Sequence, residues 1–182
     1  MMSEYAGRPW ALRAAIWFLG GWVLLSLWMG YTAATNFRLV KSLPAGEEVF
    51  VSFGEGIERE QALKYVASEL NRALFASSER FQVLLGFAAV VLLVLARGAG
   101  KARLGVLSVC LLGTLLFHLA LTPSMVEVGR RIDFIERDPA HPTEDERDFR
   151  GYHAVYMSAE LAKLLALLGV AGSLLRGPRS TG

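Results

Sequence analysis

Two residues of opposite charge, Glu160 and Lys163, lie inside an otherwise uncharged apolar stretch, residues 151–175. A charge near the centre of a membrane helix costs about 2.5 kcal/mol or more unless it is paired or hydrated, so such residues mark candidate sites. Steps of three and four residues back from Lys163 reach Glu160, Tyr156 and His153, which therefore share one helix face. We expect this face to point into a helical bundle and to form a polar site there.

The other apolar stretches carry polar residues near the same end. At a helical rise of about 1.5 Å per residue, His118 and Glu160 lie at similar depths, about 7 Å and 9 Å from the membrane boundary. Asn36 ends the first stretch, and Glu79 and Gln82 begin the second. The sequence therefore predicts a ligand-binding or buried polar cluster with members from all four stretches: Glu160, Lys163, His118, His153, Tyr156, Asn36, Glu79 and Gln82.

The composition indicates a protein of the lipid bilayer. Hydrophobic residues make up 53% of the chain, and its mean hydropathy is +0.38. The apolar residues fall in long blocks, which suit membrane helices rather than the shorter strands of a membrane barrel. We therefore predict an all-α, polytopic membrane protein with a single domain, a four-transmembrane-helix bundle. Its spans are expected at about 12–34, 80–97, 103–123 and 152–175.

Amphipathic helices are expected to cap the outer side of this bundle. Apolar residues recur at helical spacing from residue 58 to 78, and this helix can continue directly into the second span. The recurring residues are Leu63, Val66, Leu70 and Leu74.

Two capping signals mark further helix starts. Pro123 precedes a capping box that begins at Ser124, so we expect the chain to kink or restart there and to form an amphipathic helix over 124–137. A second capping box, from Thr143 to Glu146, is expected to begin the last helix outside the membrane.

The distribution of Lys and Arg predicts the orientation. Residues 97–103 and the two terminal segments are basic, whereas the loops 35–80 and 127–150 are net acidic. Cytoplasmic loops carry the excess of basic residues, so we expect an inner (plasma) membrane protein with both termini in the cytoplasm. The net charge of +2 is too small to indicate nucleic-acid binding. The first span, preceded by Arg13, also resembles a signal peptide, but its length favours retention.

Cofactor and partner predictions rest on few residues. Cys110 is the only cysteine, so neither a disulfide nor a thiol redox pair can form within the chain. We expect no cofactor, with a metal ion or haem b at His118 and His153 as the alternative. Small residues along the last span allow close helix approach, either within the monomer or in a homodimer. They include Ser158, Ala162, Ala166 and Gly169.

Four segments carry a further signal. They are residues 37–44 after the first span, 67–75, 121–123 at the end of the third span, and 149–153 at the start of the fourth. In this order they resemble the four-span family typified by transmembrane protein 205, a domain of unknown function, over about 10–175 of the chain. The resemblance implies a membrane bundle, loosely similar to proteins linked to copper tolerance and to a haem-binding four-helix protein of porphyrin synthesis. It implies no particular reaction.

Three functions fit these patterns. The first is the binding or translocation of a cation, a proton or a small polar ligand at the polar site. The second is a structural or assembly subunit in which Glu160 and Lys163 pair to hold helices together. The third is a haem b redox protein with His118 and His153 as axial ligands. An enzyme with Glu160 as a general base is disfavoured, because the neighbouring Lys163 stabilises the ionised carboxylate.

Overall fold

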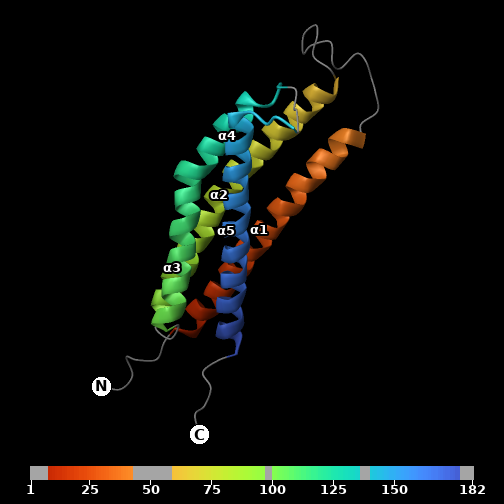
Figure 1. The fold of residues 1–182 in the computed structure, drawn as a ribbon. Coiled ribbons are helices and arrows are strands. Elements are labelled where there is room, and N and C mark those ends of the chain that lie inside the picture. The colour runs from red at the N-terminus through yellow and green to blue at the C-terminus, as the bar shows by residue number, and fades with distance from the viewer. Residues whose placement is uncertain (1–7, 43–58, 97–99, 136–139, 177–182) are drawn as a thin grey trace, which may run out of the picture.

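The computed structural model describes residues 8–42, 59–96, 100–135 and 140–176. The described residues form helices joined by short turns, and they contain no strand (Figure 1). Four helical stretches are long and apolar enough to cross a membrane, which confirms the predicted all-α, multi-pass fold. The elements are α1 (Pro9–Ser42), α2 (Arg59–Ala96), α3 (Lys101–Leu116), the π-helical turn η3 (Phe117–Leu121), α4 (Thr122–Arg131) and α5 (Glu144–Leu175).

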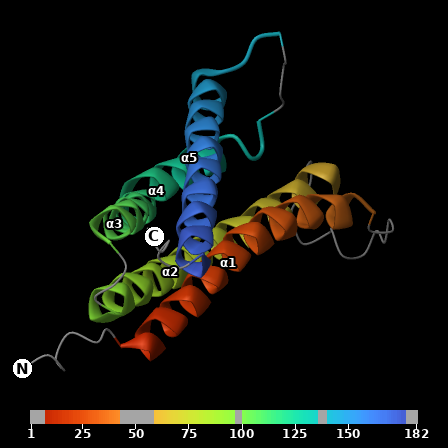
Figure 2. The same cartoon turned by 90° about the horizontal axis from the view of Figure 1, so that it is seen from below.

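The helices pack as a ring in which α1 contacts α2, α2 contacts α3, α3 contacts α5 and α5 returns to α1. Figures 1 and 2 show α1 and α2 side by side, with α5 crossing them and α4 continuing the line of α3. We call the end where α1 and α3 begin the Arg103 end, and the opposite end the Arg72 end. In this ring α2 and α5 lie diagonally, so long side chains can meet between them.

The second helix is a single element. α2 unites the expected amphipathic helix with the second span in 38 residues, so residues 59–78 do not form a separate helix across the bundle mouth. Near the Arg72 end, the buried face of α2 carries the small residue Ala67 and the polar residue Asn71. On its other face, Val66 and Leu70 are more than 40% exposed. This arrangement suits a helix whose outer face meets lipid, because apolar side chains lose nothing by facing hydrocarbon.

The third span passes through a π-helical turn before Pro123. The backbone N–H of Thr122 reaches back to the carbonyl of Phe117, five residues earlier. Pro123 lacks an N–H and its ring crowds the carbonyl of Leu119, and a widened turn relieves this crowding. The prediction of a disturbance at Pro123 is confirmed.

The expected capping box at Ser124 is wrong. The Ser124 hydroxyl donates to the carbonyl of Ala120 within the preceding turn, so the helix does not begin there. α4 also ends at Arg131, earlier than the expected residue 137, and Asp133 beyond it bonds to α2. Residues 136–139 lie outside the described part of the chain.

The expected capping box at Thr143 is confirmed. The Thr143 hydroxyl accepts a hydrogen bond from the Glu146 backbone N–H at 3.3 Å, and the Glu146 carboxylate accepts one from the Thr143 N–H at 2.8 Å. Such reciprocal bonds satisfy two donors that a helix start leaves open. They fix the start of α5 at the Arg72 end, well before Tyr156 and Glu160.

An apolar core fills the half of the bundle nearest the Arg103 end. It includes Leu19 and Trp22 of α1, Leu93 of α2 and Leu167 of α5. A Cβ on Gly86 would lie 2.6 Å from the Trp22 ring, so only glycine lets α2 approach the indole this closely. The core therefore ends at Trp22, and the indole N–H points into the polar layer above it.

Candidate functional site

A buried carboxylate, Glu79, lies at the centre of the polar layer. It is 1% exposed and belongs to α2. The Thr122 hydroxyl donates to its Oε1 at 2.5 Å, and Nδ1 of His118 lies 3.2 Å from its Oε2. The Tyr156 hydroxyl also interacts with this carboxylate. Among the described residues, none of these partners carries a permanent positive charge.

A second group surrounds Lys163, whose side chain is 7% exposed. The ammonium donates to Oε1 of Glu160 and to Oε1 of Gln82, both at 2.5 Å. Gln82 Oε1 also accepts from the Trp22 indole N–H at 3.0 Å and from Ser26 at 3.4 Å. Gln82 thus joins α1, α2 and α5 through one oxygen atom.

The two groups form one layer. Glu79 and Gln82 lie three residues apart on the same face of α2. Tyr156 packs edge-on against Phe75 with ring centroids 5.7 Å apart, and this contact holds its hydroxyl near Glu79. Among the described residues, the layer therefore contains two carboxylates, one ammonium and the imidazole of His118.

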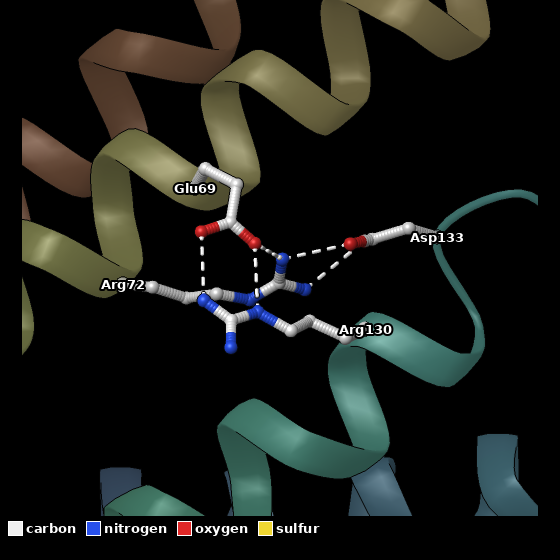
Figure 3. Close-up of polar contacts among 4 residues, drawn as sticks. All are labelled: Glu69, Arg72, Arg130 and Asp133. Carbon is white, nitrogen blue, oxygen red and sulfur yellow. Dashed lines mark hydrogen bonds and ion pairs between the residues drawn. The ribbon is translucent and has the colours of Figure 1, made fainter.

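A separate ionic cluster lies at the Arg72 end (Figure 3). Arg72 binds both carboxylate oxygens of Asp133, at 2.7 Å and 3.0 Å, and also Glu69 at 2.7 Å. Arg130 completes the cluster with bonds of 3.0 Å and 3.1 Å to Glu69. Two guanidinium groups face two carboxylates, so the cluster is electrically neutral while it ties α2 to the end of α4.

Two cavities approach the polar layer from opposite ends. One, of about 410 Å³, extends from Arg72 and Phe149 to Gln82 and Glu160. The other, of about 560 Å³, lies between α3 and α5 and extends from Ala102 to Glu160. We call them the Arg72 cavity and the Arg103 cavity. Glu160 lines both cavities.

The structure brings six of the eight predicted site residues into this layer: Glu79, Gln82, His118, Tyr156, Glu160 and Lys163. The other two lie apart from it. Asn36 donates to the side chain of Asn71 at 2.7 Å, nearer the Arg72 end. His153 is exposed, packs against Phe149 with centroids 6.1 Å apart, and lines the Arg72 cavity.

The two histidines predicted as a pair of axial ligands have different neighbours. His118 contacts Glu79, whereas His153 contacts Phe149. Within the described ranges, no three His, Cys, Asp or Glu side chains lie close enough together to hold a metal ion. The small residues Ala162 and Ala166 line the Arg103 cavity opposite α3, and their role in a homodimer stays a prediction.

Sequence reasoning missed three residues that complete the polar layer: Trp22, Ser26 and Thr122. Trp22 and Ser26 lie four residues apart on α1, a spacing that could have marked an inward face. Thr122 lies four residues after His118, and this spacing was a usable signal for a shared partner. Hydroxyl residues are common in membrane helices, so Ser26 gave no clear signal by itself.

No protein-family model, curated protein or solved structure matches the chain. The resemblance to the transmembrane protein 205 family therefore stays a prediction. The chain is an integral membrane protein with four apolar helical spans and a polar layer between them.

Proposed function

We propose that this membrane protein binds a monovalent cation in exchange for a proton, and passes both between the two ends of the bundle. The observation that carries the proposal is the buried Glu79 carboxylate, which hydrogen-bonds to Thr122 and His118, lies near the Tyr156 hydroxyl and has no permanent cation among these neighbours. A buried carboxylate with no positive charge beside it costs several kcal/mol of folding free energy when it is ionised. The Glu79 and His118 pair should therefore hold a proton in its resting state.

The charges of the whole polar layer also indicate that it holds one proton. Glu79 lies against His118 from η3, Thr122 from α4 and Tyr156 from α5. In the adjoining group, Lys163 binds Glu160 and Gln82, and α1 contributes only the uncharged Trp22 and Ser26. With His118 neutral, two carboxylates face one ammonium and the layer has a net charge of −1. One proton neutralises it, and so does one monovalent cation. Competition for this single charge is the physical basis of exchange.

The two cavities support translocation rather than binding alone. They approach the layer from opposite ends, and Glu160 lines both of them. A change in the Glu160–Lys163 contact would open the layer to one cavity or the other. Transport across membranes commonly uses such a central site with access from either side.

The orientation belongs to the same proposal. Lys101, Arg103 and Arg176 lie at the Arg103 end, which the excess of basic residues assigns to the cytoplasm. A Cys110→Ala protein with cysteine introduced at Lys101 should react with an impermeant thiol reagent only from the cytoplasmic side. Labelling of this position from the outside would reverse the orientation.

Proteoliposomes test the exchange. Vesicles loaded with a pH-sensitive dye receive an inward gradient of Na⁺, K⁺ or tetramethylammonium, each in turn. We expect at least one of these cations to drive protons outward with the wild-type protein and none to do so with Glu79→Gln, which keeps the shape of the side chain and removes its charge. Thr35→Ala, which removes a hydroxyl that bonds, among the described residues, only to the Tyr31 carbonyl of its own helix, serves as the control. Equal proton movement in wild type and Glu79→Gln would refute the proposal.

A further inference from the structure

We infer that the Arg72 cavity takes an organic monocation with an apolar body, such as an aromatic or alkylated ammonium ion. This inference rests on the proposed exchange function and names its substrate class. It depends on three features of the cavity: its aromatic walls, the charge at its inner end and the neutrality of its mouth.

The walls suit an apolar cation better than a hydrated metal ion. Four aromatic side chains line the cavity, Phe37, Phe75, Phe149 and Tyr156, together with three methionines. Ring faces and edges of this kind bind alkylated ammonium ions through cation–π attraction, and methionine adapts to apolar shapes. A volume of about 410 Å³ lies in the range of small-molecule sites.

The inner end supplies negative charge. Glu160 lines the cavity, and Lys163 occupies only its Oε1, so its Oε2 accepts no hydrogen bond from the described residues. Behind it lie Gln82 and Tyr156, and the Tyr156 hydroxyl interacts with Glu79. A cation in the cavity would therefore face a free carboxylate oxygen and the net negative charge of the polar layer.

The mouth does not repel a cation. Arg72 lines the cavity, but its guanidinium is bound by both oxygens of Asp133 and by Glu69, as Figure 3 shows. A Cβ on Gly129 would lie 2.9 Å from Arg72 Nη2, so the close approach of α4 at glycine keeps the guanidinium in this cluster. Its charge is thus neutralised before it can oppose an incoming cation.

Isothermal titration calorimetry of the full chain in lipid nanodiscs tests this assignment. The probe is phenyltrimethylammonium, and its control is the uncharged isostere tert-butylbenzene. We expect phenyltrimethylammonium to bind at least about tenfold more tightly, since only the charged molecule compensates the layer. Phe75→Leu should weaken its binding by about fivefold, the usual size of a cation–π loss. Phe81→Leu, which changes an exposed phenylalanine of the same helix, should leave the affinity unchanged.

The outcomes separate the two proposals. Equal affinity for the charged and uncharged probes, or equal effects of Phe75→Leu and Phe81→Leu in proteins with the same melting temperature, would overturn the assignment of the cavity. If Na⁺ or K⁺ drives proton movement while phenyltrimethylammonium neither binds nor drives it, the substrate class is wrong and the exchange function stands. If no cation, including phenyltrimethylammonium, moves protons in a Glu79-dependent manner, the exchange function itself fails.

Discussion

Removal of Glu160 should destabilise the bundle more than removal of Glu160 and Lys163 together. In Glu160→Ala the Lys163 ammonium, 7% exposed, keeps only the neutral Gln82 oxygen as a hydrogen-bond acceptor. Breaking a buried ion pair costs about 3–5 kcal/mol. Because the Glu160 side chain is 18% exposed and Gln82 remains, we expect the lower limit, about 3 kcal/mol.

The double variant Glu160→Ala with Lys163→Met removes both charges and keeps most of the lysine stem as apolar volume. It should be more stable than Glu160→Ala by about 2 kcal/mol, because the second substitution removes the stranded ammonium. Thermal unfolding of Glu160→Ala, Lys163→Met and the double variant in one detergent measures the coupling between the two charges. Additive losses, or a double variant less stable than Glu160→Ala, would refute the argument that the two charges depend on each other.

Three further predictions concern the supports of the site, and each is checked by unfolding in detergent. Gly86→Ala places a methyl 2.6 Å from the Trp22 ring and should cost about 1–3 kcal/mol through overpacking. Asp133→Ala leaves the Arg72 guanidinium short of its bidentate partner and should cost about 2 kcal/mol, because hydrogen bonds to buried charges are strong. Thr143→Ala removes the capping box of α5 and should cost about 1 kcal/mol.

Matched substitutions provide the controls for the first two of these predictions. Gly20→Ala meets no atom within 4 Å and should be neutral or slightly stabilising, so an equal loss at Gly20 and Gly86 would contradict the packing argument. Glu127→Ala breaks only an exposed ion pair with Arg131 and should leave the stability nearly unchanged. A loss as large as that of Asp133→Ala would mean that the buried cluster has no special role.

The spans could be predicted because uninterrupted apolar length is itself the physical requirement for crossing a membrane. The inward face of α5 could be predicted for a similar reason, since Tyr156, Glu160 and Lys163 recur at helical spacing within an apolar stretch. The ends of helices outside the bundle were harder to predict from the sequence. The end of α4 at Arg131 depends on the contact between Asp133 and Arg72, two residues 61 positions apart.

Contacts between helices could not be predicted from the sequence either, because they also join residues far apart in the chain. Helical spacing fixes which residues share a face but not which helices become neighbours. The sequence therefore suggested His118 with Glu160 from their depth, whereas in the structure His118 contacts Glu79. The role of Trp22 depends on the close approach permitted by Gly86, which no local pattern indicates.

The most direct test of the proposed exchange is the number of protons released per cation bound. The detergent-solubilised protein is titrated with phenyltrimethylammonium, Na⁺ and K⁺ in turn in weakly buffered solution, and the pH change is compared with the calorimetric binding stoichiometry. We predict about one proton released for each cation bound by the wild-type protein, and none from Glu79→Gln, because one charge suffices to neutralise the polar layer. Cation binding without proton release, or release that persists in Glu79→Gln, would contradict the account.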